Sequence, residues 1–242
     1  MSVLAAPIAA AWLAVAPPGE AASPACGPDA EATLAASAAA VDRGDFAGAI
    51  EALESRPDGG AACPLLALAT ASLRGWRAAI AAGDRGGAAD ALKPAQAALD
   101  ALASAAAGPP SAGAYAAALL HGAVVAAQDE REELRVWIEH ARDLSERLGA
   151  GREAPRWPLP VDVAEGELWY LVDDFELSEA AFARALASPP ETPLAWRGLA
   201  RARDRRGDRQ GACAAYRRTL EVAQPGSGIA AEARGYVLVC TP

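Results

Sequence analysis

The chain has 242 residues, of which 52% are hydrophobic, so it is long enough to bury a sizeable core in one elongated domain or two small ones. Aromatic residues make up only 5%, alanine supplies much of the apolar content, and β-branched runs are few, which favours an all-α protein. The formal net charge of −9 argues against a general nucleic-acid-binding protein.

The first residues resemble an export signal. An apolar run from Val3 to Ala16 is too short to span a bilayer comfortably, and the small residues near Ala21 and Ala22 suit cleavage there. No Lys or Arg precedes the run, so an ordinary apolar N-terminal segment is the alternative. We therefore expect residues 1–22 to be a signal peptide of a protein of the bacterial periplasm or cell envelope, with no stable membrane span in the mature chain. A cytoplasmic protein is the alternative.

Glycine and proline divide the rest of the chain into helical stretches. Breaks fall at residues 56–63, 108–113, 149–160, 188–193 and 224–228, and shorter turns lie near residues 44, 83, 128, 173 and 207. Beyond the first few residues of each stretch, the only proline between these breaks and turns is Pro94, which suits helices joined by tight turns. Taken in pairs, they predict an all-α fold: a right-handed α-α superhelix of about five antiparallel helix hairpins, with a C-terminal capping helix over about 229–239.

A three-residue pattern recurs at the shorter turns. Gly207 is followed after five residues by the small Ala212 and after four more by the aromatic Tyr216. The turn residue ends one helix, the small residue lets the partner helix approach, and the large residue fills the gap between the two. The same offsets occur in Gly44, Ala49 and Leu53; in Gly83, Ala88 and Leu92; in Asp173, Ser178 and Phe182; and, degraded, in Gln128, Glu133 and Trp137. The chain therefore contains an internal repeat.

The last two units resemble the tetratricopeptide repeat family. The match is carried by Trp196, Leu199, Ala212 and Tyr216 in one unit and by Gly166, Trp169, Phe182 and Pro190 in the unit before it. Phe182 precedes Tyr216 by 34 residues, the family's period, whereas Ala200 stands where the family usually has glycine. Because the resemblance weakens before residue 161, we expect degenerate hairpins over 26–160 and two closer repeats with the capping helix over 161–242.

The resemblance implies a non-catalytic protein–protein interaction scaffold that binds a peptide or protein partner in a helical-repeat groove. A structural subunit of a bacterial envelope-associated assembly is the alternative from another class, and a small-ligand sensor or enzyme is a third. Only two histidines are present, His121 and His140, and neither has the spacing of a metal site. We expect no enzymatic activity, no cofactor and no metal. The third hypothesis would need a deep pocket that holds His121 with a carboxylate.

Four cysteines remain, and their even number in a chain with an export-like start favours disulfides. Cys26 and Cys63 precede the first helices of consecutive hairpins, so these two are expected to pair. Cys213 lies in the last repeat and Cys240 ends the capping helix, which favours the second pair. Four small buried thiols in a reducing compartment are the alternative.

One charged constellation stands out in the last repeat. Arg197, Arg201 and Arg205 are spaced four apart and therefore lie along one face of a helix. In proteins that this chain resembles, that face lines the concave groove, where guanidinium groups suit the carboxylates of an acidic partner. The alternative is internal pairing, because Glu167 lies 34 residues before Arg201 in the preceding, acidic repeat.

The remaining candidate for partner contact is Trp157, in the proline-rich stretch before residue 160. A loop of this kind either contacts a partner through its single aromatic residue or packs that residue back onto its own domain. No sequence feature fixes the oligomeric state.

Overall fold

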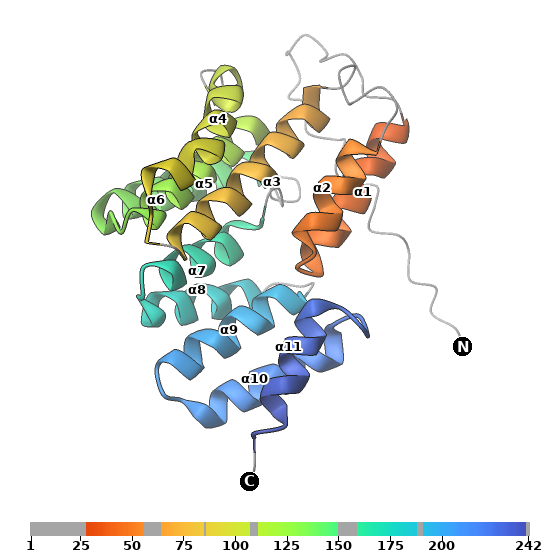
Figure 1. Ribbon diagram of the computed structural model, residues 1–242, viewed down its shortest axis with the longest axis vertical. Coiled ribbons are helices and arrows are strands. Elements are labelled where there is room, and N and C mark those ends of the chain that lie inside the picture. The colour runs from red at the N-terminus through yellow and green to blue at the C-terminus, as the bar shows by residue number, and fades with distance from the viewer. Residues whose placement is uncertain are drawn as a thin grey trace.

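The computed structural model describes residues 28–55, 64–84, 86–106, 111–149, 159–187 and 191–240, which contain eleven helices and no strand (Figure 1). The helices form five antiparallel hairpins and a final single helix, so the predicted all-α superhelix with a capping helix is confirmed. The hairpins are α1 (Pro28–Asp42) with α2 (Phe46–Glu54), α3 (Pro64–Gly83) with α4 (Ala89–Ala106), α5 (Ala112–Ala127) with α6 (Arg131–Gly149), α7 (Val161–Leu171) with α8 (Phe175–Ala187), and α9 (Pro193–Arg205) with α10 (Arg209–Val222). The capping helix is α11 (Gly228–Val237).

The predicted signal peptide over residues 1–22 lies outside the described residues. Among the helices that the structure describes, none is both long enough and apolar enough to cross a membrane.

Short polar side chains begin several of the helices. The side chains of Asp45, Ser111, Thr192, Asp208 and Ser227 each accept a hydrogen bond from the backbone N–H three residues later. Such N-caps satisfy backbone donors that have no partner within the helix, so these five helices each start at a residue that the sequence specifies.

The turns inside the hairpins follow the predicted pattern in three cases and depart from it in two. Gly44, Asp173 and Gly207 have positive φ, as the residue that ends each first helix requires. In the third hairpin the positive φ belongs to Asp129, not Gln128, so the buried positions five and nine residues later are Leu134 and Ile138. Glu133, which the predicted register placed in the core, is exposed.

The second hairpin departs further, because its turn is longer than the spacing from Gly83 implies. Positive φ angles fall at Gly86 and Gly87, and Ala88, predicted to be the small buried residue, is exposed before α4 begins. Leu92 is buried as expected, at 5% exposure.

Close contact between successive repeats depends on Phe182. Its side chain is fully buried, and a Cβ atom added to Gly166 or Gly198 would lie 2.7 Å or 2.2 Å from the ring. The two glycines belong to α7 and α9, so the ring of α8 lies between adjacent first helices that approach it closely. Ser178, in the small position of the same repeat, donates a hydrogen bond of 2.8 Å to the carbonyl oxygen of Gly166.

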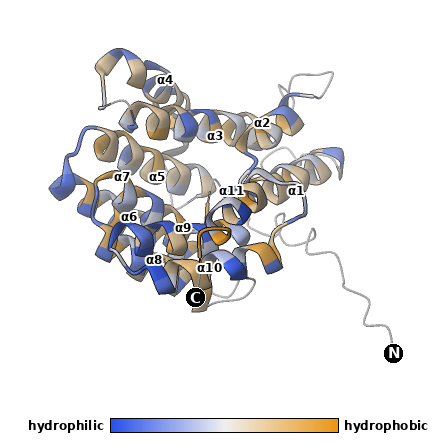
Figure 2. Ribbon diagram, turned by 60° about the horizontal axis from the view of Figure 1, so that its bottom comes forward, coloured by the Kyte–Doolittle hydropathy of each residue, from blue (hydrophilic) through white to orange (hydrophobic). Residues whose placement is uncertain are grey.

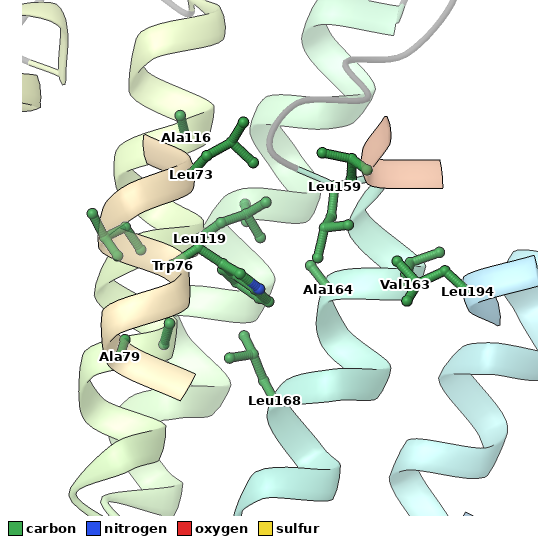
Figure 3. Close-up of a cluster of buried hydrophobic side chains, with 14 of the residues drawn as sticks. Leu73, Trp76, Ala79, Ala116, Leu119, Leu159, Val163, Ala164, Leu168 and Leu194 are labelled. Carbon is green, nitrogen blue, oxygen red and sulfur yellow. The ribbon is translucent and has the colours of Figure 1, made fainter. Parts of the chain in front are cut away.

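Helix α5 lies at the centre of the core. It packs against α3, α4, α6 and α7, and most of its residues are buried, in keeping with its mainly apolar colour in Figure 2. Figure 3 shows Trp76 of α3 beside Leu119 of α5 and Leu168 of α7. Tyr115 of α5 donates a hydrogen bond of 2.7 Å to the carbonyl oxygen of Leu159, which fixes the entry into α7.

The first hairpin and the capping helix meet, although they are far apart in sequence. The turn between α1 and α2 lies next to α11 in both Figure 1 and Figure 2. A Cβ atom on Gly44 would lie 2.4 Å from Cδ1 of Ile229 and 3.8 Å from Cδ1 of Leu194. The stack therefore curves far enough for its first and last elements to touch.

Candidate functional site

The curvature encloses a groove of about 530 Å³ on the side of the first helices. Helices α3, α7 and α9 form its walls together with the beginning of α2, while α5 lies behind α3 and α7. The described residues that line it are Gly44, Phe46, Ile50, Arg74, Trp76, Arg77, Ala78, Ile80, Ala81, Asp84, Glu167, Tyr170, Leu171, Arg197 and Arg201. This set combines aliphatic and aromatic side chains with four arginines and two carboxylates.

The predicted arginine ladder lies on one face of α9, as its spacing requires. Arg197 Nη2 is 3.3 Å from Glu167 Oε1, and Arg197 Nη1 is 3.9 Å from Glu232 Oε2 of the capping helix. Arg201 Nη1 is 3.7 Å from Glu167 Oε2. The ladder is thus ion-paired with the preceding repeat and with the cap.

Aromatic rings from the fourth hairpin support the outer half of the ladder. The guanidinium carbon of Arg201 lies 4.1 Å from the centroid of Tyr170, and that of Arg205 lies 4.4 Å from the centroid of Phe175. Arg205 also pairs with Asp173 at 3.1 Å and is not among the groove-lining residues. The ladder therefore divides: Arg197 and Arg201 line the groove, whereas Arg205 joins α9 to the α7–α8 turn.

Arg201 stays charged in this setting. Burial lowers the pKa of its guanidinium, but Glu167, Tyr170 and Glu232 together raise it by more, so the net shift is upward. Arg197 is more enclosed, with 18% of its side chain exposed. Its buried Nε has no hydrogen-bond partner among the described residues.

A second pair of arginines, not singled out from the sequence, faces the same groove. Arg74 and Arg77 lie three residues apart on α3, and Ala78 and Ala81 extend the same helical face. Arg74 forms an ion pair with Glu54 of α2. Arg77 is exposed and forms no ion pair with any residue that the structure describes. Only the superhelix brings this pair and the ladder to one site, because α3 and α9 are separated by two hairpins in the sequence.

Comparison with known proteins identifies the architecture. No family model matches the sequence, and no curated protein matches it. Among solved structures, the crystal structure of TTC0263, a thermophilic TPR protein in Thermus thermophilus, is similar with a TM-score of 0.53 and 18% sequence identity. The match covers 86% of this chain and 99% of that one. The chain has a tetratricopeptide-repeat-like fold. At this level of identity the likeness extends to the fold alone.

Within the TPR-like stack, charge pairing extends beyond the ladder. Asp162 and Glu165 of α7 are shared by Arg142 of α6 and Arg184 of α8; the bond from Arg142 Nη2 to Asp162 Oδ1 is 2.9 Å. Glu179 of α8 pairs with Arg203 of α9 at 2.9 Å. The acidic fourth hairpin is thus neutralised largely by arginines of its neighbours.

A disulfide holds the capping helix of the TPR-like stack. Cys213 in the middle of α10 and Cys240 just beyond α11 are joined, with their Cα atoms 5.9 Å apart. This is one of the two pairs that the sequence favoured. The other two cysteines, Cys26 and Cys63, lie outside the described residues, and so does Trp157.

The two histidines lie away from the groove. His121 of α5 stacks on Trp137 of α6 with ring centroids 4.2 Å apart, and exposed His140 meets the same indole at 6.0 Å. Burial lowers the pKa of His121, with Glu133 opposing the shift. No group of three or more potential metal ligands gathers among the described residues. The sensor or enzyme hypothesis needed a deep pocket that holds His121 with a carboxylate. His121 is not among the described residues that line the groove, so the groove is not that pocket.

Proposed function

We propose that the chain is a non-catalytic interaction scaffold that binds a peptide or protein partner in the groove between α3, α7 and α9. The observation that carries the proposal is the groove's lining. Among the described residues, four arginines line it against two carboxylates in a chain whose net charge is −9, and aromatic and aliphatic side chains lie between them. A partner with acidic groups matches this surface.

The size of the groove agrees with a short segment of a partner. A volume of about 530 Å³ falls in the range of roughly 300–1,000 Å³ that encloses a drug-sized ligand. Such a space takes a few side chains of a partner, while the rest of that partner lies on the surrounding helices.

Photo-crosslinking tests where the partner binds. A photoreactive amino acid replaces Ala81, which lines the groove, or Ala214, which is exposed on α10 outside it. The two variants are irradiated in native extract, and the adducts are identified by mass spectrometry. We expect a defined adduct from position 81 that position 214 does not give. Equal adduct patterns from both positions would contradict binding in the groove.

A structural subunit of an envelope-associated assembly is the second candidate, and one observation favours it. Leu238 and Val239 follow α11 with 83% and 57% of their surface exposed, at the end of the stack and outside the groove. Exposed apolar residues of this kind suit a fixed subunit contact. Replacing both by Ser would release the chain from such an assembly without affecting the groove.

We also propose that the protein is exported, and the disulfide between Cys213 and Cys240 supports this location. Disulfides persist in oxidising compartments such as the bacterial periplasm. Fractionation of cells followed by non-reducing mass spectrometry tests the proposal. Reduced cysteines in a cytosolic fraction would contradict it.

A further inference from the structure

The four described arginines that line the groove differ in the ion pairs that they form within the chain. Arg74 is paired with Glu54, and Arg197 is paired with both Glu167 and Glu232. Arg77 has no ion pair among the described residues. Two guanidinium groups are thus committed to internal partners, and one on α3 is uncommitted.

Arg201 is intermediate between these cases. Its contact with Glu167 is 3.7 Å, beyond the usual distance of a hydrogen bond, and 31% of its side chain remains exposed. Its face lies on the ring of Tyr170, so the guanidinium is held in place while its edge remains able to donate. The guanidinium of Arg201 on α9 is therefore held in a fixed position and can still donate hydrogen bonds to a bound group.

Arg77 and Arg201 belong to walls that do not pack directly on one another. In the described stack, α3 packs on α5, α5 on α7, and α7 on α9, so α7 lies between the two arginine-bearing helices. Tyr170 and Leu171 of α7 line the intervening part of the groove, and Phe46 and Ile50 of α2 add a further apolar side. Across the groove, the lining therefore changes from a charged side chain on α3, through apolar side chains on α2 and α7, to a charged side chain on α9.

We propose that the groove recognises a chain segment that carries a bulky apolar side chain between two acidic residues, with one carboxylate on Arg77 and the other on Arg201. This inference rests on the proposed function and names the chemistry of its partner. The central side chain would lie against Phe46, Ile50 and Tyr170. Each carboxylate would form charge-assisted hydrogen bonds, which are about twice as strong as neutral ones.

Glu167 forms within the chain the same kind of carboxylate–arginine contact that we propose for the partner. Its carboxylate, 13% exposed, already lies between Arg197 and Arg201, so the α9 side of the groove binds a carboxylate in the folded protein. A second carboxylate on the exposed edge of Arg201 would share that cation with Glu167. Replacing Glu167 with Gln should then strengthen binding of an acidic segment severalfold.

The test uses a displayed library of random dodecapeptides selected on the immobilised full chain. Peptides are retained if they lose binding to Ala81→Trp, a substitution that fills the groove at a lining position. We expect these groove-dependent peptides to share a large apolar residue flanked by acidic ones. Arg77→Glu and Arg201→Glu should each weaken them by about tenfold or more, the loss of one charge-assisted bond. Arg217→Glu, an exposed change on α10, should leave binding unchanged.

Charge exchange separates this inference from a general attraction between opposite charges. Changing one acidic residue of a selected peptide to Lys should restore binding to Arg77→Glu but not to Arg201→Glu, and changing the other should do the reverse. An all-glutamate dodecapeptide should bind more weakly than the selected peptides. Equal binding of that peptide would overturn the requirement for an apolar residue.

The selection also distinguishes failure of the inference from failure of the proposed function. Groove-dependent peptides without acidic residues would overturn the inference and leave peptide binding in the groove standing. A selection that yields no groove-dependent peptide would contradict both. Melting temperatures of all variants, measured alongside, identify any loss of binding that comes from unfolding.

Discussion

Gly44 lies directly against Ile229, so the turn of the first described hairpin is in contact with the last described helix. Gly44 has a φ of +73°, and a side chain there would meet the Ile229 side chain at 2.4 Å. Gly207 has a similar φ of +82° but nothing within 4 Å. The two glycines therefore share a backbone requirement and differ only in packing.

We predict that Gly44→Ala destabilises the protein more than Gly207→Ala. Both substitutions place an L side chain in the left-handed region, at a cost of about 1–2 kcal/mol. Only Gly44→Ala also requires the buried Ile229 side chain of the capping helix to shift. Urea denaturation of both variants measures the difference. Equal losses would show that the contact between the ends of the stack contributes nothing to stability.

A second comparison concerns the seam between the last two hairpins. Gly198→Ala should destabilise the protein strongly, because the new Cβ would lie 2.2 Å from the buried ring of Phe182. Gly235→Ala, in α11 with nothing within 4 Å, should be neutral or stabilising by about 0.5–1 kcal/mol, since alanine favours helix. Thermal melts decide, and a stable Gly198→Ala protein would contradict the close packing of α8 on α9.

Much of the fold could be predicted from the sequence because it is locally specified. Glycine and proline mark the ends of the hairpins, and the offsets from Gly44, Asp173 and Gly207 give the buried positions correctly. The predicted register of the buried positions is wrong in the hairpins where neighbouring residues compete for the turn position. Gln128 and Asp129 both suit a turn, and Asp129 adopts the positive φ because a short polar side chain tolerates it better. Two further glycines lengthen the turn after α3.

Only some of the residues that line the groove could be predicted from the sequence. The four-residue spacing on α9 identified Arg197 and Arg201, because a helix places such residues on one face. Arg77 and Phe46 could not be found this way. They join the site only because the stack curves until its first and last elements touch, and no local spacing encodes that curvature. The assignment of residues 26–160 to degenerate repeats remains a prediction. So does the assignment of Trp157 to a partner contact.

The disulfide should contribute measurably to stability. Replacing both Cys213 and Cys240 with Ser should lower the free energy of unfolding by about 2–4 kcal/mol, the typical contribution of a disulfide. Reductant should lower the stability of the wild-type protein by at least as much, and it should have a smaller effect on the double variant, which lacks this disulfide. A double variant as stable as the wild type would show that α11 is held by its packing alone.

Stability should fall in mildly acidic solution through His121. Its pKa in the folded protein lies below the ordinary value of 6.5 because burial disfavours the charged ring. Folding therefore favours the neutral form, and this contribution is complete above pH 6.5 and is lost as the pH falls through the folded pKa. His121→Gln should flatten the dependence of melting temperature on pH in mildly acidic solution relative to the wild type. A variant profile identical to that of the wild type would contradict the assignment.

The ladder's two roles can be separated by comparing substitutions on opposite walls of the groove. Arg201→Glu places a carboxylate beside Glu167 and removes the cation from Tyr170, so it should lower the melting temperature as well as partner binding. Arg77→Glu disrupts no ion pair among the described residues and should lower binding alone. Raising the salt concentration should weaken binding to the wild type, because charges are screened over about 10 Å at 0.1 M.

The most direct measurement is capture of the photo-crosslinked partner by wild type, Arg77→Glu and Arg217→Glu, with melting temperatures taken side by side. If the groove binds an acidic partner, Arg77→Glu loses capture at an unchanged melting temperature and Arg217→Glu retains it. If Arg77→Glu captures the partner as well as the wild type does, Arg77 contributes nothing to binding, and the claim that the groove binds an acidic partner is contradicted.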